Sequence, residues 1–500
     1  MPVTFQTQQL HTDGPVWIAT IRSIHQQELK REPTDAEIAA HVAWVLEERD
    51  GVWDANKMRA FVQGLEEWKN QRIPKPPVEA VVPVIPAVPD RPAVRRGVVR
   101  AEGRVFADET GRFRPFGGTL FWALFGWKNE QQRVKDNLAW LANHGVQYVR
   151  ILGQVGWPTE TIDPAWPDYV PLLSNFLDTA YNTFGLRTEI TCVGGGGTFS
   201  STDLATRVVA AVKGREHTVM HLEVANEYFA TFNNEPEIRK MADILRQLPL
   251  LLAPSSPGGG NEIELSRLMQ TGPYTMATVH KQRDNGDHDW RFVRQNWDYK
   301  DKPWPVSNNE PKGPFASVSH CEDPLRLAMD RAVGILCGVG AYVLHNANGI
   351  FGRPNDHASG GHRSANVWEL DNADAIYDGA AHVDSLIPDG VENWTNANDH
   401  WTPPNPVHPL PVPPEQFWEI GRGDHGVNKN YAAIDGERFV CMPCGVLNFV
   451  EMRARQPCEI KAFHPVTRKL VVQRRLSAGE TVRLEGDANA NAAFIVVGQP

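Results

Sequence analysis

Several features that would fix a function class are absent from this 500-residue chain. No stretch approaches the roughly 18 apolar residues that a membrane-spanning helix needs. Positive charge is not in excess either: the formal net charge is −10, whereas a nucleic-acid partner requires a basic face to bind phosphates. We therefore expect neither a membrane nor a nucleic acid as a partner.

Cysteine is scarce, and its spacing does not define a metal site. Six cysteines are too few for a disulfide scaffold. Cys441-x-x-Cys444 with Cys458 nearby would suit zinc or a redox pair, but no second pair follows at ligand spacing. We predict small buried side chains here, and no metal.

Cofactor and targeting signals are missing as well. No Gly-x-Gly-x-x-Gly fingerprint stands where a dinucleotide-binding domain needs one, and the run Gly194–Gly197 lacks the lysine of a phosphate-binding loop. We expect no cofactor. Met1 to Gly14 lacks the basic start and apolar run of a secretory signal. The location of the protein therefore stays open: it is cytoplasmic, associated with a virion, or exported by a signal that has been trimmed.

Composition shifts divide the chain into four parts. Residues 1–72 read as three helices, with a capping box at Thr34-x-x-Glu37, and 73–96 form a Pro-rich extended linker. Residues 97–426 are predicted to form a barrel with a long irregular C-terminal excursion, and 427–500 an antiparallel β-sandwich. The helical part weakly resembles short modules of extracellular and phage-associated proteins, which implies docking to another protein or self-association.

Short apolar strands alternate with amphipathic helices over about 250 residues after the linker. Eight such strands, each followed by a helix, favour a closed (β/α)8 TIM barrel over an open doubly wound sheet. The predicted strands are Gly118–Ala123, Tyr148–Leu152, Thr188–Val193, Met220–Val224, Leu250–Ala253, Ala277–Val279, Val306–Ser307 and Ala341–Leu344.

Two glutamates follow directly after apolar strands of this barrel. Glu227 follows the fourth predicted strand and Glu310 the seventh. The C-terminal strand ends form the active-site face of such barrels, so the two carboxylates are expected to meet across the mouth. Hydrolysis of a glycoside with retention needs two carboxyl groups about 5–5.5 Å apart.

The placement of Asn226-Glu227 and Glu310 resembles the signature of a large clan of retaining barrel glycosidases, which includes cellulases, β-mannanases and β-galactosidases. The resemblance extends over roughly residues 97–350. It implies that Glu227 is the acid/base and Glu310 the nucleophile. It also implies that Asn226 binds the sugar 2-hydroxyl.

Further residues are assigned through the same resemblance. Arg150 stands where these enzymes carry an arginine that bonds to the nucleophile, and His280 is expected beside the acid/base. Sixteen tryptophans suit a glycan-binding cleft, and those at or near predicted strand ends or following loops are candidate sugar platforms: Trp122, Trp127, Trp157, Trp290 and Trp304. Of these, Trp122 and Trp304 are assigned to substrate binding. His345 follows the eighth strand, where the clan commonly has a tryptophan, and is assigned to substrate binding.

The sequence therefore predicts a retaining glycosidase that cleaves a β-linked oligo- or polysaccharide and needs no metal or cofactor. Two alternatives remain open: a catalytically inactive glycan-binding or virion/surface structural protein, and a barrel enzyme of other chemistry such as a lyase. In the clan an aromatic residue commonly follows the sixth-strand histidine by two positions, where this chain has Gln282. This departure and that at His345 motivate the first alternative. Side chains alternate along a strand, so Glu223 should lie on the same side as Glu227 and point into the barrel one layer below it. We interpret Glu223 as a buried partner for a base that lines the barrel.

Overall fold

The computed structural model describes residues 95–499 except 158, 197–198, 228–233, 256–261, 281–289, 315–320, 353–364, 400–417, 421–428, 437, 447–448, 455 and 488–490. The predicted helical module (1–72) and nearly all of the predicted linker (73–96) lie outside the described residues. Within the described part, no helix has the length and apolar character needed to cross a lipid bilayer.

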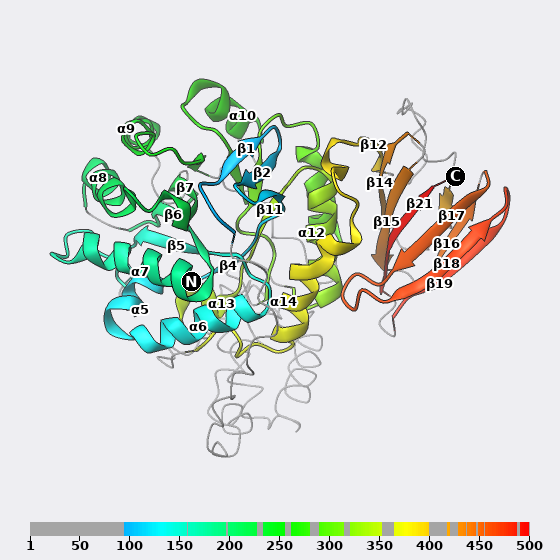
Figure 1. Ribbon diagram of the computed structural model, residues 1–500, viewed down its shortest axis with the longest axis horizontal. Helices are drawn as coiled ribbons and strands as arrows, with labels where there is room; N and C mark the ends of the chain where they lie inside the picture. The colour runs from blue at the N-terminus through cyan, green and yellow to red at the C-terminus, as the bar shows by residue number, and fades with distance from the viewer. Residues whose placement is uncertain are drawn as a thin grey trace, which may run out of the picture. The chain divides into compact units, whose positions relative to one another are not determined.

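Eight parallel strands form the central sheet, which confirms the predicted barrel. They are β4 (Phe116–Thr119), β5 (Tyr148–Gln154), β6 (Arg187–Val193), β7 (Val219–Ala225), β8 (Leu252–Ser255), β9 (Ala277–Val279), β10 (Val306–Asn308) and β11 (Ala341–Leu344). Their order is β8-β7-β6-β5-β4-β11-β10-β9 (Figure 1). The amide of Thr275 donates to Leu252 O at 2.9 Å, which brings the two end strands together and nearly closes the barrel.

Helices surround the barrel and bury one face each. In α7, Leu173, Phe176 and Leu177 are fully buried at helical spacing, and Gly185 ends the helix in the left-handed conformation that glycine adopts most readily. The helices are α5 (Ala123–Asn129), α6 (Gln131–Asn143), α7 (Tyr169–Phe184), α8 (Ser201–Val212), α9 (Glu235–Leu245), α10 (Glu262–Thr271), α11 (Arg291–Arg294), α12 (Pro324–Leu336), α13 (Ala347–Phe351) and α14 (Ala373–His382), with 3-10 turns at η1 (Glu216–Thr218), η4 (Gln295–Tyr299), η5 (Val383–Leu386) and η6 (Val391–Asn393).

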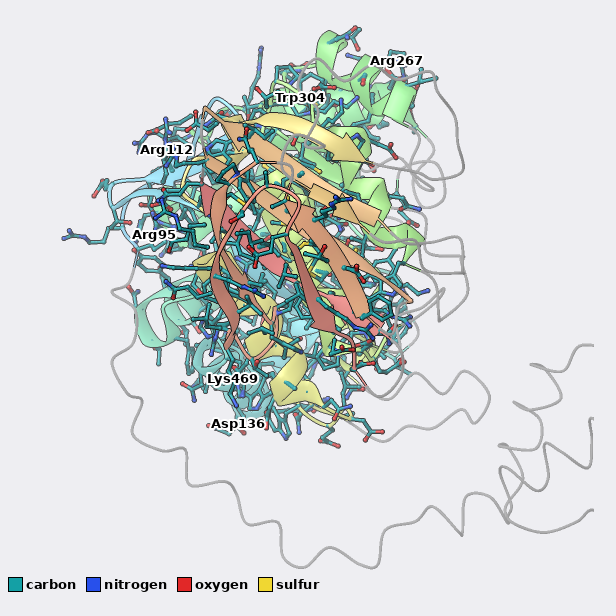
Figure 2. The ribbon with its side chains drawn as sticks, turned by 90° about the vertical axis from the view of Figure 1, so that its right-hand side faces the viewer. Arg95, Arg112, Asp136, Arg267, Trp304 and Lys469 are labelled. Atoms are coloured by element: carbon teal, nitrogen blue, oxygen red, sulfur yellow. The ribbon has the colours of Figure 1, made fainter. Side chains whose placement is uncertain are left out.

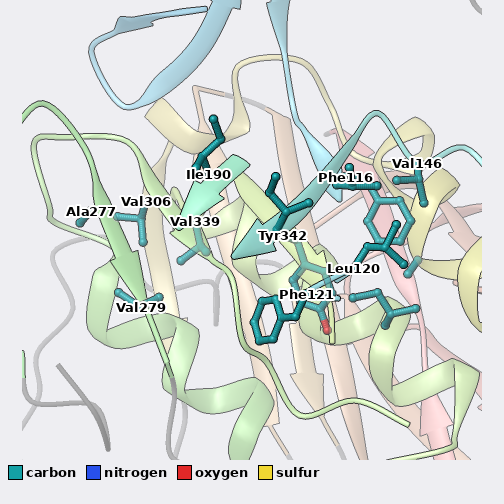
Figure 3. Packing of buried hydrophobic residues seen from close by; sticks show 14 of the residues in the cluster. Phe116, Leu120, Phe121, Val146, Ile190, Ala277, Val279, Val306, Val339 and Tyr342 are labelled. Atoms are coloured by element: carbon teal, nitrogen blue, oxygen red, sulfur yellow. The ribbon is translucent and has the colours of Figure 1, made fainter. Parts of the chain in front are cut away.

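The two ends of the barrel differ. A small antiparallel sheet of β1 (Arg100–Glu102), β2 (Val105–Asp108) and β3 (Gly111–Phe113) precedes the barrel. Phe106 and Phe113 from this sheet share a buried cluster with Tyr148 and Met220, which lie at the starts of β5 and β7. The sheet therefore closes the N-terminal end, and the C-terminal end remains as the mouth. Within the main core, Phe116, Val306 and Tyr342 come from three neighbouring strands (Figure 3).

The first barrel strand lies earlier than predicted. The expected strand Gly118–Ala123 is instead β4 at Phe116–Thr119, followed by a turn in which Ala123 N donates to Leu120 O. This turn starts α5, with Trp122 at its N-cap. The hydrophobic run continues from strand into helix without a polar break, so its composition did not mark the boundary.

Antiparallel sheets follow the barrel, as predicted. The larger sheet has the order β12-β14-β15-β21-β17-β18 with β20 paired to β15, and the smaller has the order β13-β16-β19. Two of the strands, β12 and β13, precede the predicted boundary at residue 427. The strands are β12 (Thr395–Asp399), β13 (Trp418–Ile420), β14 (Lys429–Asp435), β15 (Arg438–Val446), β16 (Phe449–Ala454), β17 (Cys458–Phe463), β18 (Leu470–Leu476), β19 (Thr481–Glu485), β20 (Asn491–Ala493) and β21 (Ile495–Gln499) (Figure 2).

The sandwich is packed on the barrel through apolar side chains. Tyr431, Met442 and Ile495 belong to the same buried cluster as the barrel core, and the ring of Tyr431 lies 6.0 Å from that of Trp297. Burial of this shared surface couples the stability of the two parts.

Candidate active site

Glu227 follows β7, a fully buried strand of the barrel. Every residue of β7 is buried, and its side chains alternate between two faces. His221 and Glu223 point into the barrel, while Leu222 and Val224 point outward and join the apolar core. The amide of Asn226 continues the ladder by donating to Val193 O at 2.7 Å. Glu227 then adopts φ +40°, a conformation that costs energy for a residue with a Cβ.

Glu310 is placed by a tight turn after β10. The loop that follows it runs against the end of β11, because Ala347 N donates to Pro314 O at 3.1 Å. Only glycine fits at position 313, since a Cβ there would lie 1.8 Å from His345 O. This contact holds Glu310 and His345 at the same level of the mouth.

The two glutamates meet across the mouth. One carboxylate oxygen of Glu227, one carboxylate oxygen of Glu310 and one imidazole nitrogen of His280 all lie within 4.8 Å of one another. The side chain of Glu310 is 5% exposed and that of Glu227 is 24% exposed. The environments of the two carboxyl groups therefore differ, as a division into two catalytic roles requires.

His280 bridges the pair, next to Glu227 as expected. Its Nδ1 lies 2.8 Å from Glu227 Oε1 and 3.4 Å from Glu310 Oε2. The ring is 1% exposed and follows directly after β9. One imidazole thus contacts both carboxylates and fixes their separation.

Arg150 on β5 holds Glu310 from below. Its Nη1 donates to Glu310 Oε1 at 2.7 Å, and its Nη2 to Glu223 Oε2 at 2.7 Å. Its Nε lies 3.1 Å from Glu189 Oε1. Burial alone would lower the pKa of Arg150, but the charges of Glu223, Glu310 and Glu189 outweigh it and raise that pKa. The guanidinium is therefore permanently charged.

Glu223 is the buried partner of a base, as its strand position predicted. Burial alone would raise its pKa, yet the charge of Arg150, then that of His280, and a 2.6 Å hydrogen bond from Thr191 hold the pKa below its ordinary value. Glu223 is fully buried beneath the mouth, so it supports the site without facing it.

Asn226 and His345 complete the ring of polar groups. Asn226 Oδ1 accepts from Arg150 Nη2 at 2.7 Å, which fixes the orientation of the amide. His345 Nδ1 lies 3.0 Å from Thr119 Oγ1, and its Nε2 lies 3.9 Å from Glu310 Oε2. Both residues are therefore where the sequence placed them, at the edge of the carboxylate pair.

The two tryptophans assigned to substrate binding do not face the mouth. Trp122 is 1% exposed; its Nε1 donates to Asn348 O at 3.0 Å, and Arg133 covers its ring at 4.2 Å. Trp304 precedes β10 and so lies at the N-terminal end of the barrel, whereas Glu310 follows the C-terminal end of the same strand. For both residues the prediction is corrected: neither ring is offered to a ligand at the mouth.

Sequence reasoning did not find Glu189 and Thr191, the latter hydrogen-bonded to Glu223 and Arg150. Glu189 accepts from Asn309 Nδ2 at 2.8 Å and lies 3.3 Å from His221 Nε2, so it ties the segment that carries Glu310 to the layer beneath. The signal was available: Glu189 and Thr191 alternate with apolar residues along β6, which marks them as facing the barrel interior.

In the described part of the chain, one set of His, Cys, Asp and Glu side chains is compact enough to share an ion: Glu227, His280 and Glu310. Carboxylate oxygens and an imidazole are donors that zinc accepts. The six cysteines are buried and form no disulfide, and the predicted absence of a Cys441–Cys444 metal site remains a prediction.

Comparisons with known proteins yield a structural likeness. No protein-family model matches the sequence, and no curated protein matches it. A solved structure described as a glycoside hydrolase is similar over 81% of this chain and 96% of its own, with a TM-score of 0.54 and 12% identity. A glycoside hydrolase family 5 protein from Bacteroides vulgatus is similar over 81% and 92%, with a TM-score of 0.53 and 14% identity. The chain therefore has the fold of these proteins, a barrel followed by antiparallel sheets.

Proposed function

We propose that this chain is a retaining glycoside hydrolase that cleaves a β-glycosidic bond in an oligo- or polysaccharide by double displacement. The observation that carries the proposal is the separation of the carboxylates, whose oxygens lie within 4.8 Å. Retaining enzymes hold the two groups about 5–5.5 Å apart, whereas inverting enzymes leave roughly 6.5–9.5 Å for a water molecule.

The surroundings of each carboxylate suggest its role. Glu310 is almost buried and accepts a charge-assisted bond from Arg150, which stabilises the negative charge of a nucleophile. Glu227 is more exposed and contacts His280 rather than a guanidinium, which suits a group that must gain and lose a proton.

The proposed reaction has two steps. Glu310 attacks the anomeric carbon while Glu227 donates its proton to the departing oxygen, which leaves a sugar ester on Glu310. Glu227 then takes a proton from water, and the resulting attack at the anomeric carbon releases Glu310 and a sugar of retained configuration. Asn226, whose amide accepts a hydrogen bond from Arg150, would bind a hydroxyl of the sugar during both steps.

Turnover of aryl glycosides by three variants tests the proposal. Glu227→Ala and Glu310→Ala should each lower kcat by at least about 10³-fold, because each removes a group that takes part in bond cleavage. The exposed Glu451 on β16 offers a matched control, and Glu451→Ala should retain full activity. An activated 2-fluoro sugar should label Glu310, identified by peptide mass.

Two outcomes would contradict the proposal. Saccharide binding without turnover, equal in the wild type and both variants, would indicate an inactive glycan-binding protein. Turnover with no label on Glu310 and with inverted product would indicate another mechanism.

A further inference from the structure

We propose that Trp157 and Phe351 form a sugar-binding platform at the barrel mouth. It would hold the part of a β-linked chain that lies on the glycone side of the cleaved bond. The inference rests on the proposed glycosidase function and extends it to the substrate class: a saccharide with at least two sugar units on that side.

The two aromatic rings come from different elements and lie side by side. Their centroids are 5.4 Å apart with an interplanar angle of 46°. Both side chains are half-buried at the edge of the main core, so each keeps part of its surface accessible. Large aromatic faces that remain accessible are the usual supports for sugar rings in binding clefts.

Chain direction places both rings at the mouth. Trp157 follows the C-terminal end of β5 by three residues, and Phe351 ends α13, which follows β11. Because β5 and β11 flank β4, the pair spans the end of that strand. The helix α13 begins directly after His345 and Asn346 and advances by only about 7 Å, which keeps Phe351 near the nucleophile.

The position of the acid/base decides which part of the substrate the platform faces. Glu227 protonates the departing oxygen, so the leaving group must lie on the side of β7. In the order of the eight strands, β11 stands four positions from β7 and is therefore opposite to it across the mouth. A chain that extends away from Glu227 consequently runs toward β11 and α13, over Phe351.

The helix that carries Phe351 is firmly held. Asn346 Oδ1 accepts from Gly349 N at 2.7 Å as the N-cap, and Gly349 O accepts from Phe121 N at 2.8 Å. Trp122 donates to Asn348 O from beneath. A rigid support reduces the ordering cost when a ligand binds. This support is also the role that the structure gives to Trp122.

The test compares substrates of different length on variants of the platform. In the wild type, kcat/KM should rise as a chromogenic aglycone is given one, two and three sugar units. Trp157→Ala and Phe351→Ala should lower kcat/KM for the longer substrates by about 10-fold or more, since each loses an aromatic contact. The one-sugar substrate should change by less than about twofold.

Matched variants separate stacking from folding. Trp157→Phe and Phe351→Tyr keep an aromatic face and should retain the preference for longer substrates, while Phe351→Leu keeps apolar volume and should lose it. Phe199, another half-buried aromatic at the mouth after β6, provides a control, and Phe199→Ala should leave the length dependence intact. Thermal unfolding establishes that each variant is folded.

Three results would overturn the platform: no length dependence in the wild type, equal loss on all substrates, or loss for Phe351→Tyr equal to that for Phe351→Leu. Failure of the glycosidase proposal is distinguishable. If the wild type binds oligosaccharides without turnover, the affinity measured by calorimetry is compared instead of kcat/KM. Trp157→Ala and Phe351→Ala should then still weaken the binding of the longer chains and leave that of the shortest unchanged.

Discussion

Two buried arginines on neighbouring strands have opposite surroundings. Arg150 on β5 lies toward the mouth, where it contacts three carboxylates: Glu310, Glu223 and Glu189. Arg187 begins β6 at the closed end, where it shares one carboxylate, Asp108, with Arg95. Acidic groups thus outnumber basic ones around Arg150, and basic groups outnumber acidic ones around Arg187.

The closed end balances its surplus internally. Arg187 also donates to Gly97 O at 2.9 Å and His217 O at 3.1 Å, so backbone carbonyls complete its hydrogen bonds. Burial lowers the pKa of Arg187 more than Asp108 raises it, whereas the carboxylates around Arg150 raise the pKa of that group.

The contrast fits the proposed glycosidase function. An oxocarbenium-like transition state carries positive charge, and the carboxylates around Arg150 would stabilise it. The closed end lacks that purpose: its charges fasten β1–β3 to the barrel.

The largest expected effect comes from replacing each arginine by lysine. A single ammonium cannot reach Glu310, Glu223 and Asn226 together, so Arg150→Lys should lower kcat about 100-fold by misplacing the nucleophile. Arg187→Lys should cost about 1–3 kcal/mol of unfolding free energy and leave kcat within about threefold. Steady-state kinetics and urea unfolding measure both.

Arg187→Lys is the matched control, since it makes the same change on the adjacent strand. Equal losses of kcat in the two variants, with both proteins folded, would break the distinction between the ends.

A second comparison uses acid. The folded-state pKa of Glu223 is held below its ordinary 4.5, and that of Asp108 below its ordinary 3.8. A carboxylate with a lowered pKa contributes stability above its unfolded pKa and loses that contribution as the pH falls toward its folded pKa. The contribution of Glu223 should therefore fade below about pH 4.5 and that of Asp108 below about pH 3.8.

Glu223→Gln should destabilise the protein by about 1.5–3 kcal/mol at pH 7, and the gap to the wild type should narrow below pH 4.5. Asp108→Asn should show the same pattern, but starting at lower pH. Urea unfolding at pH 7, 5, 4 and 3 measures the gaps, and a gap for Glu223→Gln that widens as the pH falls below 4.5 would contradict the assignment.

Much of the barrel could be predicted because its strands are short, apolar and separated by amphipathic helices. The mouth was predictable for the same reason: Glu227, Glu310 and His280 stand directly after strands, and parallel strands bring such positions together. Their roles remain proposals, since the fold alone does not set chemistry.

The errors concern residues whose direction or element was misjudged. Trp304 precedes β10, so the chain direction alone would have indicated that it lies at the closed end and not at the mouth. Trp122 was assigned to a strand end because no polar residue marks the start of α5. Phe351 was overlooked because α13 has five residues, too few for a periodic pattern to be recognised.

The smallest expected effect concerns backbone strain. Glu227 adopts φ +40° at the mouth, while at the closed end the turn between α8 and β7 uses Gly214 at φ +83°. The left-handed conformation costs a residue with a Cβ roughly 1 kcal/mol and glycine almost nothing. The mouth therefore contains strain that the closed end avoids.

Glu227→Gly and Glu227→Ala both remove the carboxylate, so their difference in unfolding free energy reflects the backbone: the strain at this φ and the opposing entropy of the unfolded chain. The glycine variant should be more stable by about 1 kcal/mol, against the usual preference for alanine. Gly214→Ala should lose about 1 kcal/mol, and no heavy atom lies within 4 Å of its added Cβ to confuse the result. At Glu310, which is not among the described residues with positive φ, alanine should be the more stable substitution. An alanine more stable than glycine at position 227 would show that the mouth holds no such strain, and the contrast between the two ends would then rest on charge alone.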